Sequence, residues 1–238
     1  MAGASFYSRN RVNLRTAFDE PLPEQTDTYI PVPNERLFRD LTSATRRAFG
    51  QEPRDVQVGL SRKNQQMFGV RMFDVGHEER GLALGFRNSY DKSLPVCIGI
   101  GTNVFVCDNL MFSSDFVNVM RKHTKNVWGD LDRLLRDSVE SAERKFWSLE
   151  GCIKALEATP VNVDEGFEHL GRAIGHEVIQ PQQLSLAVNE WRQGYWSGHR
   201  NAWGLYNAFT EGLKRGAAGT LLGAHTKVHD FMLESFQV

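Results

Sequence analysis

Apolar residues occupy every second position in several stretches of the first half of the chain, a pattern that predicts β-strands with one buried face. The clearest stretch is 82–86, where Leu, Leu and Phe alternate with Ala and Gly. The other strands are expected at 55–61, 67–73, 94–100 and 104–107. Polar turns separate these segments, and the glycine-containing stretch 99–103 favours a tight hairpin between the last two. We therefore expect an antiparallel sheet of short strands joined by hairpins.

Helical patterns stand on both sides of this sheet in the sequence. Before it, a helix is expected from Asn34, which is a good N-cap residue, to Gly50, which suits a helix C-terminus. After it, Ser113 and Ser114 precede a short helix expected at 115–120. Two further helices are expected at 164–174 and 182–192, separated by Pro181.

The longest helix is expected from Trp128 to the residues just before Pro160. Apolar residues recur in it every seven positions, with a second apolar row four positions after the first. The two rows contain Trp128, Leu135, Ala142, Leu149 and Leu156, and Val139, Phe146 and Ile153. We favour a long core helix, with an oligomerising coiled coil as the alternative, because both use such a seam.

Together these elements predict an α+β fold: an N-terminal helix and an antiparallel β-sheet of hairpins, followed by a mainly helical C-terminal half with one long helix. We expect a flexible N-terminal arm at 1–28, the helix and sheet at 29–112, and a helical region at 113–238. The helical region either packs on the sheet as one domain or forms a separate lobe.

Basic residues gather at two places outside the expected sheet. The outer face of the first helix carries arginines with only Asp40 among them, and a basic run follows at 121–125. The nucleic-acid-binding candidates from these places are Arg36, Arg39, Arg46, Arg47, Arg121, Lys122 and Lys125. Such side chains supply sequence-independent affinity for nucleic acid through phosphate contacts. Ordinary solvation of an outer helix face is the alternative interpretation.

The segment RNSYDKS at 87–93 places several short polar side chains together. As a presented site, it offers Arg87 and Lys92 as donors to phosphate or carboxylate and Asp91 as a base or metal ligand. Tyr90 would add a stacking surface. As an ordinary hairpin turn, the same segment uses its polar side chains to bond nearby backbone. The polar-turn candidates are Arg87, Asn88, Tyr90, Asp91, Asp108 and Asn109, the last two from a corner that ends the strand at 104–107.

Aromatic and basic residues are interspersed between 191 and 215. Single-stranded nucleic acid needs both, since rings stack on bases and cations bind phosphate. A hydrophobic core with an amphipathic rim has the same composition, and we favour that interpretation. The pair His225 and His229 has the spacing of metal ligands on one helix face, but no further ligand can be joined to it from the sequence, so we expect no metal site.

Four segments carry a resemblance to a known family: RNSYDKS, the strand pair leading to VFVCDNL, the RKHT at 121–124, and NAWGLYNAFTEGLK at 201–214. Together they resemble a phage- and plasmid-encoded family that is catalogued as domain of unknown function nine hundred and thirty-two. The resemblance spans the chain from about Val56 to the C-terminus. It implies a protein of a mobile element and brings no catalytic residues with it.

The charge balance narrows the choice of partner. Lys and Arg number 28 against 29 Asp and Glu, so the net charge is −1, and any binding of nucleic acid would come from a local patch. The three cysteines lack C-x-x-C spacing, which argues against a disulfide framework or a structural zinc and favours the reducing cytoplasm of a host cell. No stretch reaches the length of a membrane span, and no cofactor is expected.

Three functional hypotheses follow. The first is a non-enzymatic protein that binds single-stranded nucleic acid in phage DNA metabolism or recombination, comparable in role to single-strand annealing proteins. The second is an oligomeric interaction module that acts through its long helix on a phage protein or a host factor such as a defence system. The third is a metal-dependent enzyme using Asp91, Asp108 and a histidine. No self-sufficient catalytic signature is present, so we favour a protein without enzymatic activity.

Overall fold

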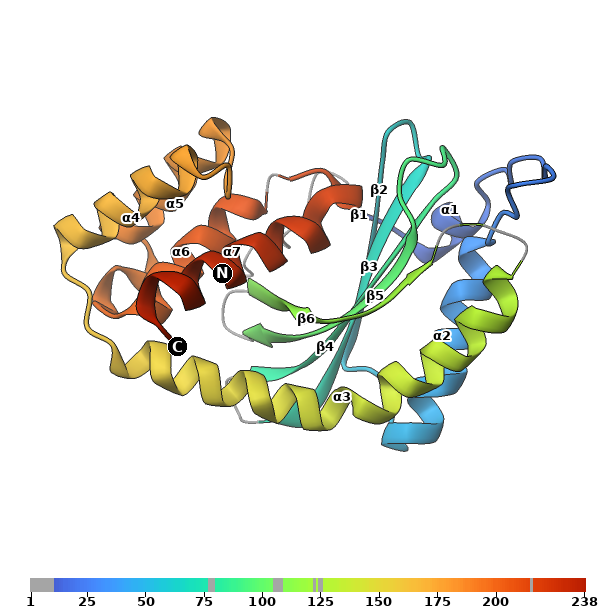
Figure 1. Cartoon of the computed structure of the whole chain (residues 1–238), viewed down its shortest axis with the longest axis horizontal. Coiled ribbons are helices and arrows are strands. Elements are labelled where there is room, and N and C mark those ends of the chain that lie inside the picture. Colours follow the sequence, from blue (N-terminus) through green and yellow to red (C-terminus); the bar gives the residue numbers. More distant parts are fainter. Residues whose placement is uncertain (1–10, 77–79, 105–108, 122, 124–125, 215) are drawn as a thin grey trace.

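The computed structural model describes residues 11–238 except 77–79, 105–108, 122, 124–125 and 215. Among these residues, six strands form an antiparallel meander that lies between two groups of helices (Figure 1). In sheet order, the strands are β1 (Arg11–Val12), β2 (Asp55–Ser61), β3 (Gln66–Gly76), β4 (Arg80–Ser89), β5 (Val96–Val104) and β6 (Asn109–Arg121). The helices are α1 (Leu14–Phe18), α2 (Asn34–Phe49), α3 (Val127–Ala158), α4 (Val163–Gly175), α5 (Pro181–Gln193), α6 (Ala202–Leu213) and α7 (Leu221–Phe236), with short 3-10 helices η1 (Tyr195–Gly198) and η2 (Ala218–Thr220). The expected α+β fold is confirmed.

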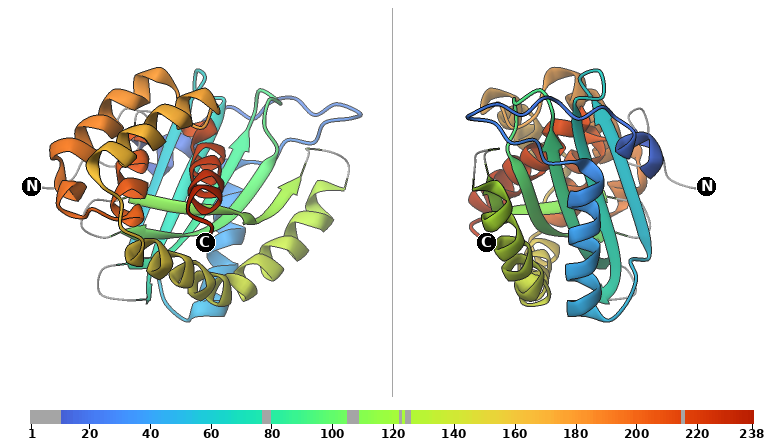
Figure 2. Two further views of the ribbon diagram at one scale, coloured as in Figure 1. Left: turned by 60° about the vertical axis from the view of Figure 1, so that its left-hand side comes forward. Right: turned by 90° about the vertical axis from the view of Figure 1, so that its right-hand side faces the viewer.

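Different helices cover the two faces of the sheet, because alternate residues of each strand point to opposite faces. On one face, α2 and the first half of α3 bury a cluster that includes Leu37 of α2 and Leu84 of β4. On the other face, Leu222 of α7 packs with Phe68 and Phe112 of the sheet. Figure 2 shows α2 lying along one face of the strands. No helix in the described part of the chain is both long and apolar enough to cross a membrane.

The long helix α3 joins the sheet to the other helices (Figure 1). Up to Phe146 its apolar seam belongs to the cluster under the sheet, and from Leu149 onward it packs with α4, α5, α6 and α7. The core-helix interpretation is confirmed, since the seam is covered within the chain. An ion pair adds to this junction: the Arg80 guanidinium of β4 lies 3.2 Å from the Glu150 carboxylate and 2.6 Å from that of Glu157.

The hairpin expected at 99–103 is wrong, because β5 continues through Gly99 and Gly101. A Cβ atom on Gly101 would lie 2.0 Å from the carbonyl oxygen of Met111 and 2.6 Å from the Phe112 ring. Glycine therefore serves here to let β6 approach closely, which is a common role of glycine inside a strand. β5 consequently continues past the predicted hairpin, to Val104.

The helix expected at 115–120 is also wrong, because this segment belongs to β6. Val117 pairs with Gly99 and Val119 pairs with Ile98. The alternate β-branched residues favour a strand, and β5 supplies a partner for it. The sheet consequently extends past residue 112, to Arg121.

The N-terminal segment is more ordered than the expected loose arm. Residues 11–12 pair with β2, and α1 follows directly. Asn34 is not the N-cap of α2, since Pro33 occupies that position. Asn34 is instead the first helical residue, and its buried amide donates a hydrogen bond to the Ala17 carbonyl at 3.0 Å. The other end of α2 is as predicted, with Gly50 at a φ of 64°.

Candidate functional site

The arginines on the outer face of α2 are partly engaged with neighbours. Arg36 Nε lies 3.5 Å from an Asp40 carboxylate oxygen, and the Arg36 guanidinium stacks 3.6 Å from the centre of the Trp128 ring. Arg46 Nε donates to Glu52 at 2.9 Å. These surface pairs reduce the net positive charge that this helix presents to a ligand.

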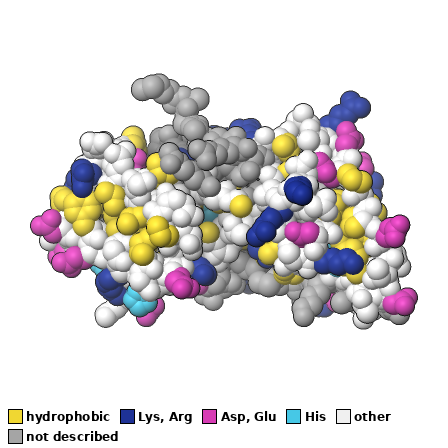
Figure 3. Space-filling model, turned by 90° about the horizontal axis from the view of Figure 1, so that it is seen from above, with side chains coloured by type: hydrophobic (Ala, Val, Ile, Leu, Met, Phe, Trp, Pro, Cys, Tyr) yellow, Lys and Arg dark blue, Asp and Glu magenta, His cyan; other side chains and the backbone are white. Residues whose placement is uncertain are grey.

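Arg39 and Arg47 complete the predicted basic face and are exposed. Arg47 borders a hollow of about 220 Å³ together with Arg136 and Glu140 of α3, so a carboxylate stands beside it. Figure 3 shows a similar mixture on the face seen from above: cationic and acidic side chains are interspersed at the end opposite α4 and α5, and hydrophobic side chains gather over α4 and α5. Neither region forms a broad basic surface.

The RNSYDKS segment forms a corner in which several side chains are buried. The Asn88 amide nitrogen donates to the Val32 carbonyl at 2.6 Å and to Asn34 Oδ1 at 2.7 Å, and Asn88 is fully buried. The Tyr90 hydroxyl accepts a hydrogen bond from the Asn34 backbone N–H at 2.9 Å. These bonds fasten the end of β4 to the start of α2. Asn88 and Tyr90 therefore act as structural ties, because these bonds hold both side chains against the start of α2.

Asp91 is held inside the same turn. One carboxylate oxygen accepts from the Ser93 backbone N–H at 3.0 Å, and the other accepts from the Gln66 amide at 3.2 Å. Burial acts to raise the pKa of Asp91, but the hydrogen bonds from Ser93 and Gln66 outweigh it and the pKa is lowered. A carboxylate occupied by these donors has the geometry of a turn-forming group.

Arg87 and Asn88 are neighbours on β4 and so point to opposite faces of the sheet. Asn88 faces α2, whereas Arg87 faces η2, where its Nη1 lies 3.5 Å from the Gly219 carbonyl oxygen. The structure therefore does not bring Arg87, Asn88 and Asp91 onto one concave surface. The single presented site that RNSYDKS predicted is not formed.

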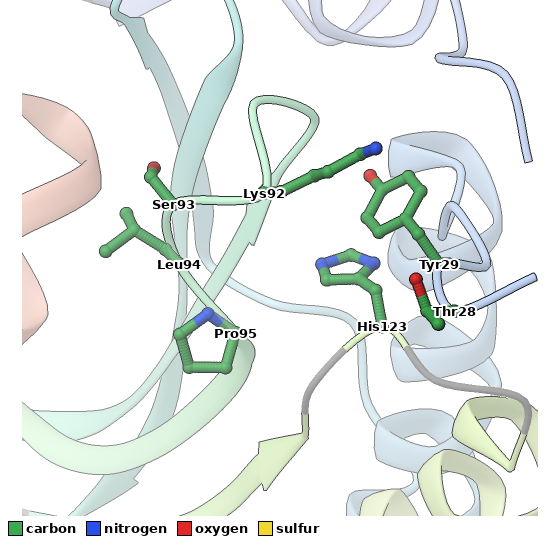
Figure 4. A pocket seen from close by; sticks show the side chains of 7 residues that line it. All are labelled: Thr28, Tyr29, Lys92, Ser93, Leu94, Pro95 and His123. Carbon is green, nitrogen blue, oxygen red and sulfur yellow. The ribbon is translucent and has the colours of Figure 1, made fainter. Parts of the chain in front are cut away.

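Lys92 does reach a pocket, and it does so together with two aromatic rings (Figure 4). The pocket has a volume of about 370 Å³. Lys92 Nζ lies 4.6 Å from the centre of the Tyr29 ring, and the centres of the Tyr29 and His123 rings are 5.1 Å apart. The pocket is lined by Thr28, Tyr29, Lys92, Ser93, Leu94, Pro95 and His123. Cation, aromatic, hydroxyl and aliphatic groups thus share one small space.

Hydrogen bonds and burial fix the chemical state of the two rings. His123 Nδ1 lies 3.3 Å from the Ile30 carbonyl oxygen, and the Ile30 N–H donates to the His123 carbonyl at 2.9 Å. Burial lowers the pKa of His123, so the ring is neutral near pH 7, and a proton on Nδ1 leaves Nε2 as an acceptor. Burial, with smaller contributions from Tyr90 and Asp91, raises the pKa of Tyr29 to about 12, so its hydroxyl stays protonated.

One residue of the predicted basic run at 121–125, His123, lines this pocket. Arg121 ends β6 opposite Val96, the residue after Pro95, and His123 follows two residues later. Lys92 of RNSYDKS and His123 therefore line one pocket, although they lie far apart in the sequence. Lys122, Lys125 and Asp108 lie outside the described residues, and Asn109 begins β6 at the end of that strand remote from Arg121.

Most of the aromatic residues near the C-terminus belong to the core. The core interpretation is confirmed for Trp191, Trp203, Tyr206 and Phe209, which are at most 3% exposed, whereas Tyr195 is 62% exposed. His225 and His229 of α7 are also buried. Within the described part of the chain, no three His, Cys, Asp or Glu side chains gather closely enough to hold a metal ion.

Tyr29 is the site residue that the sequence analysis missed. It follows a polar stretch without periodicity, and an isolated aromatic residue there has no pattern to reveal it. The available signal was the short run Tyr-Ile-Pro-Val at 29–32, where apolar residues return after the polar arm. Tyr29 and Val32 are both buried, so this run marks the entry of the chain into the core.

Comparison with known protein families, with curated proteins and with solved structures finds no match to this chain. The geometry of the pocket is therefore the basis for its functional interpretation. The resemblance to the phage- and plasmid-encoded family stays a prediction.

Proposed function

We propose that this chain is a non-enzymatic protein that binds single-stranded nucleic acid and holds one nucleotide in the pocket of Tyr29, Lys92 and His123. The observation that carries this proposal is a pocket in which the Lys92 ammonium lies over the Tyr29 ring, beside the His123 ring. Proteins that bind single strands use this combination, since rings stack on bases and cations bind phosphate. The setting that the family resemblance implies is phage or plasmid DNA metabolism or recombination in the host cytoplasm.

Lys92 takes part in both interactions of the proposed binding, the phosphate contact and the base stacking. Tyr29 is 5% exposed and its ring lies under the ammonium of the exposed Lys92 side chain, so binding requires Lys92 to turn outward to a phosphate and uncover the ring for a base. The backbone of Lys92 has a φ of 62°, which places it at the tip of a tight turn. Leu94 and Pro95 supply an apolar wall.

The charge distribution makes this binding local. The net charge of the chain is −1, and acidic side chains accompany the basic ones on the surface. Few phosphates are therefore neutralised, and each such contact changes the slope of log affinity against log salt by about 0.7 for a single strand. We expect moderate affinity that is measurable at low salt and declines as salt is added.

The interaction-module hypothesis has less support, because the apolar seam of α3 that it requires is buried within the folded chain. The seam residues from Leu135 to Leu156 are at most 2% exposed and pack in the two main clusters. Self-association stays a prediction, and a size measurement in solution tests it. The enzyme hypothesis required Asp91 as a base or metal ligand, and that carboxylate is engaged by turn donors.

A matched pair of variants tests the proposal. Lys92→Ala removes the cation at the pocket, and Lys63→Ala removes an exposed lysine from the β2–β3 turn, where the backbone φ is also positive at 55°. Fluorescence anisotropy with a labelled single-stranded oligonucleotide at low salt gives both affinities. We expect Lys92→Ala to weaken binding several-fold and to reduce the salt slope by about 0.7, with Lys63→Ala close to the unaltered protein. Absence of binding at low salt, or equal losses in the two variants, would refute the proposal.

A further inference from the structure

A second hollow lies on the opposite face of the sheet from α2, at the start of α7. It has a volume of about 430 Å³ and lies between the end of β4, the connection from α4 to α5, and the first turn of α7. Arg87, Glu177, Gly219, Thr220, Gly223 and Lys227 are among the residues that line it. Leu94 lines both this hollow and the Tyr29 pocket, so the loop after β4 separates the two.

Arg87 is a buried cation at this hollow. It is 8% exposed, and among the described residues no carboxylate forms an ion pair with it. Its Nε is buried without a hydrogen-bond partner, and Nη1 reaches the Gly219 carbonyl only at 3.5 Å. Burying a guanidinium without an anionic partner costs several kcal/mol in general, so such a group is expected to have an acceptor. The hollow it borders is where that acceptor would lie.

The first turn of α7 adds a second source of positive potential. α7 is 16 residues long, and its N-cap residue, Thr220, makes no side-chain capping bond. Gly223 in the first turn would have nothing within 4 Å of an added Cβ, so the backbone is open to the hollow. The N-terminus of a helix attracts anions through its dipole and its N–H groups.

The charged side chains lining the hollow leave a positive balance. Arg87 and Lys227 are cationic, and Glu177 is the acidic residue among the described lining residues. The Lys227 ammonium lies 3.5 Å from the backbone carbonyl oxygen of Glu177, which places it at the same rim. A guanidinium, an ammonium and a helix N-terminus are the groups that bind phosphate in proteins.

We propose that this hollow is a binding site for a phosphate group, carried by a small phosphorylated ligand or by the end of a nucleic-acid strand. Arg87 forms the base of the site, α7 directs its N-terminus to the anion, and Lys227 closes the rim. The site goes beyond the proposed nucleotide pocket, because it lies on the other side of the 90–95 loop and would bind phosphate even if the chain did not bind nucleic acid.

The test places a carboxylate where the phosphate would lie. Gly223→Asp puts an acidic side chain at the third position of α7, on the hollow that Arg87 also lines, and Gly129→Asp is the matched control at the third position of α3, where an added Cβ also meets nothing within 4 Å. An acid in a first turn favours a helix, so both variants should fold. Arg87 itself is a poorer target because its removal also changes the buried packing.

Thermal unfolding of the full chain is followed with inorganic phosphate against chloride at equal ionic strength. We expect phosphate to raise the melting temperature of the unaltered protein and of Gly129→Asp by about 3–6 °C at roughly ten times the dissociation constant. Gly223→Asp should lose this phosphate response. No phosphate-specific rise in the unaltered protein, or a full rise in Gly223→Asp, would overturn the proposal.

Oligonucleotides with and without a 5′-phosphate distinguish the two sources of the phosphate group. A strand-end site predicts tighter binding of the phosphorylated strand by the unaltered protein and no such difference in Gly223→Asp. Equal affinity of the two strands, with the response to inorganic phosphate retained, assigns the site to small phosphorylated ligands. Because inorganic phosphate is the first probe, failure of strand binding at the Tyr29 pocket does not decide this experiment.

Discussion

Replacing Asn88 by leucine should destabilise the protein strongly while leaving the nucleotide pocket in place. The Asn88 amide donates to the Val32 carbonyl at 2.6 Å and to Asn34 Oδ1 at 2.7 Å, and none of its surface is exposed. Leucine fills a similar volume but donates no hydrogen bond. The Val32 and Asn34 oxygens would each lose a donor inside the protein.

The hydrogen bonds that Asn88→Leu removes set the expected loss in the free energy of unfolding. A buried polar group left without its partner costs about 1–3 kcal/mol, so two such groups give a loss of roughly 2–6 kcal/mol in the free energy of unfolding. Asn189→Leu is the matched control, since Asn189 is exposed on α5 and surface substitutions usually change stability by less than about 0.5 kcal/mol.

Urea unfolding followed by circular dichroism measures both variants. We expect a lower midpoint for Asn88→Leu at an unchanged m-value and a midpoint near that of the unaltered protein for Asn189→Leu. Oligonucleotide affinity of folded Asn88→Leu should stay within about twofold, because Asn88 does not line the pocket. A midpoint shared by both variants would refute the structural role of the RNSYDKS corner.

Other predictions concern the core. Leu149→Asp should unfold or strongly destabilise the chain, because it puts a carboxylate at a position that is 1% exposed, whereas Ser148→Asp on the outer face of α3 should melt normally. Burial lowers the pKa of His225 to about 3, so below pH 6.5 the unfolded chain binds a proton that the folded chain does not. Stability should therefore fall by up to about 1.4 kcal/mol per pH unit between pH 6.5 and 3, and His225→Leu should flatten that dependence in urea titrations. Gly101→Val should lower the melting temperature by forcing the Met111 carbonyl away, and an unchanged value would contradict this packing.

Strand periodicity was the most informative property of the sequence. β2 spans the predicted 55–61, and α3 follows its apolar seam, because burial of one face imposes a fixed spacing on apolar residues. Gly101 misled the interpretation because a glycine in a turn and a glycine under a neighbouring strand look alike in sequence. The segment at 115–120 was misread because six residues are too few to separate strand from helix without the partner strand that β5 provides.

The site was harder to predict than the fold, because it depends on contacts between distant segments. Lys92 was found from the RNSYDKS segment, yet Asn88 in the same segment proved structural, because Asn88 lies on β4 facing α2 and Lys92 lies in the turn beyond that strand. Tyr29 joins Lys92 and His123 through tertiary packing, which no local pattern encodes. Arg87 had a candidate role from its charge, but its burial beside α7 required the three-dimensional arrangement.

Photochemical cross-linking tests the central claim most directly, because it reports where a bound strand lies. A single-stranded oligonucleotide containing 5-iodouracil is bound at low salt, irradiated, and the modified peptides are identified by mass spectrometry. Nucleotide binding in the pocket predicts adducts at Tyr29 or His123, with their yield reduced in Lys92→Ala and unchanged in Lys63→Ala. Adducts confined to α2, or no adduct at all under these conditions, would contradict the assignment of this pocket as the nucleic-acid site.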